Sequence, residues 1–214
     1  GINIGPNKDT KDQKNDFCLG LENFFDIADY ITVNISSPNT ERLRDFHDQE
    51  KLKGLLLALN QIKKDNKTNI PLLLKISPDI KDNHISEIVD VATQNDISAI
   101  ILTNTTNSNR DHLVSEAKKE EGGLSGEPIQ QISINMIKKF YKQLNGRIPI
   151  IGVGGVNSGK TAYEKIIAGA SLLQLYTGFV YKGPLVAKDI KKELIQILKS
   201  EGINNIKEAV GKDV

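Results

Sequence analysis

The sequence is poor in the residues that build disulfide-linked or metal-stabilised folds, and it lacks a long apolar segment. Its single cysteine, Cys18, excludes an internal disulfide and a cysteine-based zinc site. No apolar run reaches the length of a membrane-spanning helix. The three histidines, His47, His84 and His112, stand in polar surroundings without the spacing of metal ligands. We therefore expect these histidines at the surface, and we expect no metal site.

An excess of charge of one sign is also lacking. The 28 basic and 27 acidic residues leave a net charge of +1, so nothing in the balance favours nucleic acid as a partner. With 38% hydrophobic residues, the 214-residue chain has the composition and length of one globular domain with a sizeable core. We expect a single domain over residues 1–214. The chain opens at Gly1 inside a strand-like run, and we expect the first part of a longer protein to be absent.

Short apolar runs alternate with amphipathic segments along the whole chain. Such alternation predicts parallel strands joined by right-handed helical crossovers. Phe24, Met136 and Phe140 lie on the apolar stripes of the helices and are expected in the core. The expected strands are Ile2–Ile4, Tyr30–Asn34, Leu72–Ile76, Ala99–Thr103, Ile148–Val153 and Leu172–Tyr176. The expected helices are Asp16–Ile27, Lys51–Lys64, His84–Gln94, Ile129–Leu144, Ala162–Ala168 and Ala187–Leu198.

Both an open doubly wound sheet and a (β/α)₈ barrel are built from this alternation. Polar residues end strand after strand, and a ligand ringed by strand ends suits a barrel better than the single crevice of an open sheet. We therefore predict the α/β class and a (β/α)₈ TIM barrel, present as an incomplete barrel of about six of the eight units. The polar strand ends are Asn3, Asn34, Lys75, Thr103-Asn104 and Tyr176-Thr177.

The stretch Asn34–Thr40 is the most polar of these strand ends. Pro38 removes a backbone donor and disfavours helix at Ser37, so the strand stops in a turn that presents amides and hydroxyls. Such strand ends form the active-site rim of barrel enzymes. A turn without a chemical role is the alternative interpretation.

The segment 150–161 has the pattern of a strand, a glycine loop and a helix. Gly154–Thr161 satisfies G-x-x-x-x-G-K-[ST], so a P-loop nucleotide-binding enzyme is the alternative function. Its late position, and the lack of a following strand that ends in Asp, weigh against that function. In the other interpretation, Gly155 and Tyr176-Thr177 hold the single phosphate of a substrate or of FMN. Gly122–Gly126 adds either a further loop to this rim or a plain turn.

Lys75 follows the apolar run Leu72–Leu74 inside an expected strand. Burying a lysine there costs desolvation free energy unless an anion lies nearby. Lys75 is therefore expected to face negative charge on a substrate or on a reduced flavin. A solvated strand-end lysine and a Schiff-base nucleophile remain open.

At these positions the chain resembles the class 2 dihydroorotate dehydrogenases, the quinone-linked FMN enzymes of pyrimidine synthesis. The resemblance covers essentially all 214 residues. It implies FMN as cofactor, dihydroorotate and orotate as substrate and product, and a quinone as electron acceptor. The motifs that carry it are Gly1–Gly5, Asn34–Thr40, Leu74–Asp79, Thr103–Thr106, Gly122–Pro128, Ile148–Val156 and Ala168–Thr177.

The resemblance also implies roles for individual residues. Ser37 would be the base that takes the substrate C5 proton while a hydride passes from C6 to flavin N5. A serine hydroxyl is a weak base alone, so we expect Thr40 and a water to form a proton exit. Lys75 would stabilise the reduced flavin near N1. The implied FMN contacts are Asn3, Asn34, Lys75, Thr103, Gly126, Gly155, Tyr176 and Thr177, and the implied substrate contacts are Asn34, Asn39, Asn104 and Thr105.

Members of that family carry membrane- and quinone-binding helices and two barrel strands before the position of Gly1. The resemblance thus implies a peripheral inner-membrane location, bacterial or mitochondrial, through a region outside this sequence. Without those strands the sheet keeps unpaired edges. We therefore expect this polypeptide alone to be unstable or inactive. A truncated chain that binds nothing is the non-catalytic alternative.

Overall fold

A computed structural model describes residues 1–214 apart from 109 and 112, so the expectation for His112 lies outside the described residues. The described chain contains a sheet of six parallel strands in the order β1-β2-β3-β4-β5-β6. Strand order equals chain order, as right-handed crossovers around a barrel require. The strands are β1 (Ile2–Ile4), β2 (Ile31–Asn34), β3 (Leu72–Ile76), β4 (Ile97–Leu102), β5 (Ile150–Val153) and β6 (Ala170–Gln174).

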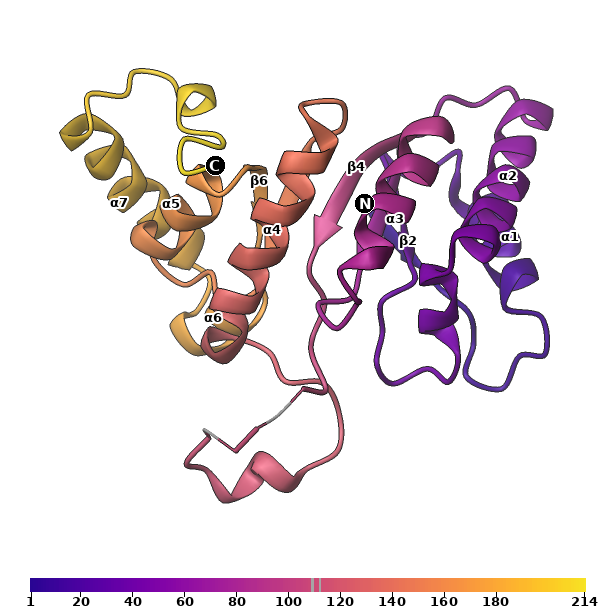
Figure 1. Ribbon diagram of the computed structural model, residues 1–214, viewed down its shortest axis with the longest axis horizontal. Helices are drawn as coiled ribbons and strands as arrows, with labels where there is room; N and C mark the ends of the chain where they lie inside the picture. The colour runs from indigo at the N-terminus through magenta and orange to yellow at the C-terminus, as the bar shows by residue number, and fades with distance from the viewer. Residues whose placement is uncertain (109, 112) are drawn as a thin grey trace.

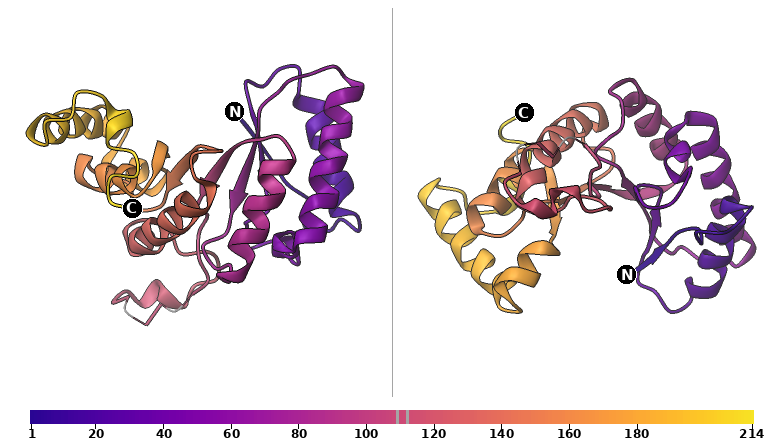
Figure 2. Two further views of the ribbon diagram at one scale, coloured as in Figure 1. Left: turned by 45° about the horizontal axis from the view of Figure 1, so that its top comes forward. Right: turned by 90° about the horizontal axis from the view of Figure 1, so that it is seen from below.

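The sheet is open: β1 pairs only with β2, and β6 only with β5, within the described chain. The helices lie along the outer face of the curved sheet, with the N-terminal half at one end and α7 at the other (Figures 1 and 2). An open, curved array of parallel β/α units is the predicted incomplete barrel. The helices are α1 (Gln13–Phe24), α2 (Gln49–Asp65), α3 (Asn83–Gln94), α4 (Gln130–Leu144), α5 (Gly159–Ile167), α6 (Thr177–Lys182) and α7 (Val186–Ser200).

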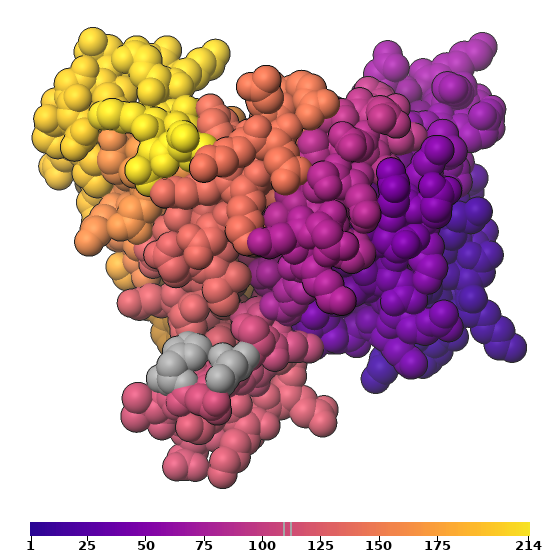
Figure 3. Space-filling view, in the orientation of Figure 1, coloured from indigo at the N-terminus to yellow at the C-terminus, as the bar shows by residue number. Residues whose placement is uncertain are grey.

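Short 3₁₀ helices occupy several connections: η1 (Leu43–His47), η2 (Glu116–Lys119), η3 (Glu127–Ile129) and η4 (Ile206–Glu208). The segment that contains η2 projects from the body of the molecule (Figures 1 and 3). Its side chains are mostly exposed, which agrees with its charged sequence. It follows β4 and returns to the sheet edge through the glycine loop 122–126.

The core lies between the sheet and the helices, and the apolar stripes of the helices build it. Phe140 and Met136 of α4 are buried, as predicted. Phe24 is 37% exposed, so the prediction that it lies in the core is wrong. Phe25 packs against the core instead, because it lies four residues after buried Leu21 and continues that face of α1.

His47 is buried, with 5% exposure, so its expected surface position is also wrong. Its Nδ1 lies 2.9 Å from the Arg44 carbonyl oxygen, and its Nε2 accepts from the Ser77 backbone N–H at 3.4 Å. Both contacts suit a neutral ring that carries its proton on Nδ1. Burial lowers the pKa of His47 to about 4. The ring joins η1 to the loop after β3.

The buried, neutral His47 should make the fold sensitive to mild acid. Its pKa is about 4 in the folded chain and near 6.5 when exposed, so the unfolded chain binds the proton first as pH falls. Stability should be unaffected by this group above about pH 7.5 and should fall by roughly 2 kcal/mol by about pH 5. Urea unfolding at the two pH values measures this, and His47→Gln should remove most of the difference. A wild-type stability that is equal at both pH values would contradict the assignment.

Candidate functional site

The polar ends of β2, β3 and β4 meet at the carboxyl edge of the sheet. Asn34 ends β2 directly opposite Lys75 of β3. Beyond β4, the Asn104 N–H donates to the Ile76 carbonyl at 3.2 Å, and the Thr103 N–H donates to the Val153 carbonyl at 3.1 Å. These bonds extend β4 between its neighbours, so consecutive side chains are held at fixed places on the rim.

A network of side-chain hydrogen bonds joins two of these strand ends. Asn34 Oδ1 accepts from the backbone N–H of Ser36 at 3.2 Å and from its hydroxyl at 2.6 Å. Asn104 Nδ2 donates to Ser36 Oγ at 2.8 Å, and Asn104 Oδ1 accepts from the Thr105 N–H at 2.7 Å. Ser36 is fully buried and acts as the bridge. Sequence reasoning overlooked it, although its place between Asn34 and Ser37 was a signal.

The bridge orients the Asn34 amide. Because its oxygen accepts from Ser36, its NH₂ group is the end that can donate to a bound molecule. Asn104 Nδ2 also donates to Asn34 Oδ1 at 3.5 Å, so Asn104 keeps one lone pair on its oxygen beyond the bond from Thr105. The pair can therefore offer both donors and an acceptor to a ring that carries carbonyl and N–H groups.

A cavity of about 340 Å³ lies beside this network. Lys75 lines it and is half-buried; burial lowers the pKa of Lys75 below its usual range, with no charged neighbour among the causes. Ile129, Val153 and Leu175 supply an apolar part of the wall. Such a cavity accepts a flat apolar ring, and the lysine favours negative charge at its edge. The predicted site residues in the lining are Lys75, Thr103, Asn104, Thr105, Gly126, Gly155, Tyr176 and Thr177.

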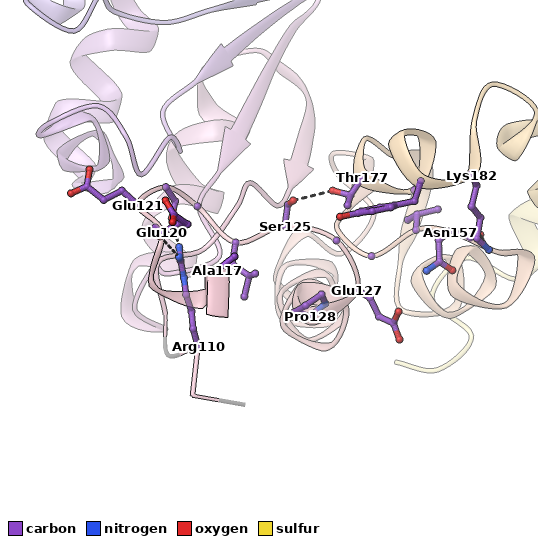
Figure 4. A pocket seen from close by; sticks show the side chains of 18 residues that line it. Arg110, Ala117, Glu120, Glu121, Ser125, Glu127, Pro128, Asn157, Thr177 and Lys182 are labelled. Atoms are coloured by element: carbon purple, nitrogen blue, oxygen red, sulfur yellow. Dashed lines mark hydrogen bonds between the residues drawn. The ribbon is translucent and has the colours of Figure 1, made fainter. Parts of the chain in front are cut away.

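A second cavity of about 640 Å³ adjoins the first and shares several lining residues with it, Gly126, Gly155 and Thr177 among them. The two cavities form one groove along the rim. The Thr177 hydroxyl donates to Ser125 Oγ at 2.9 Å and joins the two sides of the groove (Figure 4). Lys182 and Asn157 line its outer part (Figure 4). The shared end is polar and open enough for a phosphate group.

Two glycines let the backbone approach neighbouring residues closely where the two cavities meet. Gly155 has φ +76°, and a Cβ there would lie 2.6 Å from Gln130 Cβ. Gly126 has φ +80°, and a Cβ there would lie 2.9 Å from Thr177 Cγ2. A side chain at either position would be strained and crowded. Main-chain atoms therefore border the groove at both places.

The remaining predicted residues lie outside the lining of both cavities. Ser37, Asn39 and Thr40 stand on the loop after β2, where Ser37 Oγ accepts from the Asn39 N–H at 3.2 Å. Gly123 packs against Thr105 and Pro38, so the glycine loop lies beside the Ser37 turn. Asn3 is exposed on β1, at the open edge of the sheet. Asn34 reaches the groove only through Ser36 and Asn104.

The strand expected over Leu172–Tyr176 ends at Gln174, and Tyr176 instead stands at the N-cap of the short helix α6, which sequence reasoning missed. Tyr176 is 79% exposed, although it borders the groove. The Leu-rich apolar run that predicts a strand continues through Leu175. The helix after it has too few residues to show a 3.6-residue period.

The residues of the nucleotide-loop motif at 154–161 cap and anchor helix α5. Ser158 Oγ accepts from the Thr161 N–H at 3.2 Å, and Thr161 Oγ1 accepts from the Ser158 N–H at 3.0 Å. This reciprocal pair caps α5. The Gly159 N–H donates to Glu193 Oε2 at 2.5 Å. A carboxylate and a helix cap thus occupy groups that a triphosphate would need, which argues against the P-loop alternative.

Fold and groove place the chain among the parallel β/α barrel proteins whose site lies at the carboxyl rim. The model of the dihydroorotate dehydrogenase family matches residues 1–198, and the chain belongs to that family. The crystal structure of the Eimeria tenella dihydroorotate dehydrogenase in complex with ferulenol superposes with a TM-score of 0.95 at 37% identity. The chain is covered completely and spans 61% of that structure, which confirms the prediction of an incomplete barrel.

Curated relatives named dihydroorotate dehydrogenase (quinone) are similar in sequence. The protein of Bartonella tribocorum is 43% identical over 97% of this chain and 59% of its own length. The mitochondrial protein of Arabidopsis thaliana is 41% identical over the whole chain and 47% of its own length. The chain thus spans about half to three fifths of these relatives. Within the described residues, no helix combines the length and apolarity needed to cross a bilayer.

Replacement of Gly155 by alanine should damage the groove through crowding and not only through backbone strain. Gly146 is the matched control, because its φ is +75° and a Cβ there would have no neighbour within 4 Å. We expect Gly155→Ala to lower the free energy of unfolding by about 1–2 kcal/mol more than Gly146→Ala. Urea denaturation of both variants measures this. Equal losses would contradict the close approach of Gln130.

Proposed function

We propose that this chain forms the FMN- and substrate-binding part of a quinone-linked dihydroorotate dehydrogenase, which oxidises dihydroorotate to orotate in pyrimidine synthesis. The observation that carries the proposal is the inner cavity, which Lys75 and Asn104 line together with Gly155 and Thr177, the residues that it shares with the outer cavity. Membership of the family and the names of its relatives support it.

The groove fits FMN in three respects. Gly155 borders its polar end with main chain, where a Cβ would crowd Gln130, and Thr177 adds a hydroxyl for a phosphate. Apolar side chains line the part that would hold the ring. Lys75 offers a half-buried ammonium group to the ring edge. FMN, when bound, supplies the acceptor for the hydride that leaves the substrate.

We assign further cofactor contacts to Asn3, Asn34, Thr103, Gly126 and Tyr176. Thr103, Gly126 and Tyr176 border the groove, which supports their assignment. Asn34 has its NH₂ end available for a carbonyl oxygen of the ring. Asn3 lies outside the described groove, so its assignment rests on the family resemblance alone. All these proposed contacts belong to the single FMN-binding barrel domain that we propose over residues 1–214.

The substrate would lie against the amides Asn34, Asn39 and Asn104 and the hydroxyl of Thr105. Amides suit a pyrimidine ring because they donate and accept at adjacent atoms. Ser36 holds Asn34 and Asn104 at a fixed separation, and fixed partners orient a ring better than mobile ones. Asn104 is therefore the contact that we expect to set the substrate's position.

Ser37 is the proposed base. Ser37 would pass its own hydroxyl proton to water by way of Thr40 as its oxygen takes the carbon-bound proton of the substrate. That oxygen accepts from the Asn39 N–H, which stabilises the negative charge that it carries before the substrate proton arrives. Among the described residues of this loop there is no His/Asp pair that could support Ser37. The Asn39 N–H is therefore the group that stabilises its oxygen.

Quinone reduction and contact with an inner membrane would depend on sequence outside residues 1–214. The names of the relatives support the quinone, and one relative is mitochondrial. Further β/α units would pair with β1 and β6, whose outer edges have no strand partner in the described chain. Leu172 of β6 and Tyr181 of α6 are 62% and 85% exposed and would be covered by them.

The proposal predicts that Ser37→Ala abolishes chemistry but not binding. In the protein expressed at its full gene length, dihydroorotate should bleach the flavin absorbance without oxygen, and Ser37→Ala should slow this step by about 10³-fold. The FMN content and the affinity for orotate should stay within about twofold, because the variant keeps every amide that is proposed to hold the ring. Stopped-flow absorbance measures the rate. Unchanged bleaching would remove Ser37 from its role.

Lys75→Met should make the bound flavin harder to reduce. The ring gains negative charge on reduction, and the variant lacks the ammonium group that would stabilise this charge. We expect the midpoint potential to fall by about 30–60 mV. Potentiometric titration measures it. Lys53→Met, at an exposed position on α2, is the control and should leave the potential unchanged. Equal potentials in both variants would show that Lys75 does not face the flavin.

A further inference from the structure

Asp79 lies outside the groove but contacts several of the loops that form it. It belongs to the loop after β3, four residues beyond Lys75. Its Oδ1 accepts a short hydrogen bond from the Thr106 hydroxyl, and its Oδ2 accepts from the Asn107 N–H at 3.1 Å. Arg44 Nη2 lies 3.0 Å from Oδ2. We call Arg44, Asp79, Thr106 and Asn107 the Asp79 junction.

Thr106 extends the junction to a further loop. Its N–H donates to the Leu124 carbonyl at 3.1 Å, and the Leu124 N–H donates back to the Thr106 carbonyl at 2.8 Å. Thr106 is fully buried, and its hydroxyl lies within hydrogen-bond distance of two acceptors, Asp79 Oδ1 and, at 2.8 Å, Ser108 Oγ. The carboxylate is the stronger acceptor of the two because it is charged. The glycine loop is thereby tied to the loop after β4.

Each loop tied to the junction carries residues of the groove or of the Ser37 turn. Arg44 follows the Ser37 turn in η1. Thr106 comes directly after Asn104 and Thr105, and Leu124 comes directly before Ser125 and Gly126. Asp79 itself borders neither of the two cavities of the groove. Its influence on the groove must therefore pass through these neighbours.

The negative charge of Asp79 matters as well as its hydrogen bonds. The Arg44 side chain is 29% exposed, and its Nε and Nη2 have no hydrogen-bond acceptor among the described residues. Nη2 nevertheless lies at ion-pair distance from Asp79, so this carboxylate is its counter-charge. Loss of the charge would leave a largely buried cation without a partner and would loosen η1.

We propose that Asp79 is a positioning residue that sets Asn104 and Thr105 relative to Ser37. The inference rests on the proposed function and adds a residue to it that touches neither substrate nor cofactor. A misplacement of about 1 Å at a reacting centre lowers rates by about a hundredfold. The contacts of the junction join the loops after β2, β3 and β4.

The test uses the protein expressed at full gene length and loaded with FMN. Asp79→Asn keeps the size of the side chain and removes its charge, and Thr106→Val keeps the shape and removes the hydroxyl. Thr106→Ser restores the hydroxyl and serves as the conservative rescue. Asp82→Asn is the matched control, because Asp82 lies three residues on and pairs with exposed Lys139 at 2.6 Å, away from the groove.

We expect Asp79→Asn and Thr106→Val to lower the flavin reduction rate per bound FMN by about 10- to 100-fold at saturating dihydroorotate. The orotate dissociation constant should rise about tenfold, whereas FMN content should stay near that of the wild type. Thr106→Ser and Asp82→Asn should behave as the wild type. If Asp79→Asn does not fold, the Thr106→Val and Thr106→Ser pair decides.

The inference is overturned if Asp79→Asn and Thr106→Val match Asp82→Asn in rate per bound FMN. It is also overturned if activity falls only in proportion to FMN content, since that is loss of folded protein. If the proposed function is wrong, dihydroorotate will not bleach the flavin absorbance of the wild-type protein. The two failures are thus distinguished by the wild-type control.

Discussion

Parallel strand pairing is the constraint on which the rest of this structure depends. Because β1 to β6 all run in one direction, their carboxyl ends share one edge, and the residues that follow them are brought together without any sequence proximity. Asn34 and Asn104 are 70 positions apart, yet both bond to Ser36. Strand direction therefore brings the residues of the rim together, and the individual side chains then determine its chemistry.

Hydrogen bonds then convert proximity into fixed geometry. The Ser36 bridge fixes the amides, the backbone bonds of Thr103 and Asn104 hold the end of β4 between its neighbours, and Asp79 ties the loops behind them. The inner cavity of the groove has few charges, whereas the outer one is lined by Arg110, Glu120, Glu121, Glu127 and Lys182. Lys75 is the ammonium group that borders the inner cavity among the described residues, and its burial makes it responsive to a bound anion.

Much of the fold was predictable because it follows from local pattern. Alternating apolar runs predicted strands, helices and an incomplete barrel. Of the predicted polar strand ends, Lys75, Thr103-Asn104 and Tyr176-Thr177 line the groove, whereas Asn3 and Asn34 do not. Tertiary contacts decided the rest. His47 is buried because the Ser77 N–H and the Arg44 carbonyl satisfy its ring, and no local pattern reveals such partners. Ser36 and Asp79 lie in the motifs Asn34–Thr40 and Leu74–Asp79, but no role was predicted for either because their contacts are with residues distant in sequence.

A segment can also match the sequence pattern of a motif without having the function that the motif indicates. Gly154–Thr161 has the spacing of a nucleotide loop, but Thr161 caps α5 and Glu193 accepts from Gly159. We propose instead that the strand ends surround a single flat ring, with a phosphate beside the glycines. A crystal structure of the full-length protein with FMN and orotate is the decisive experiment. We expect the phosphate at Gly155 and Thr177, the ring edge at Lys75, and orotate on Asn104 beside Ser37. A flavin bound elsewhere, or an orotate remote from Ser37, would contradict it.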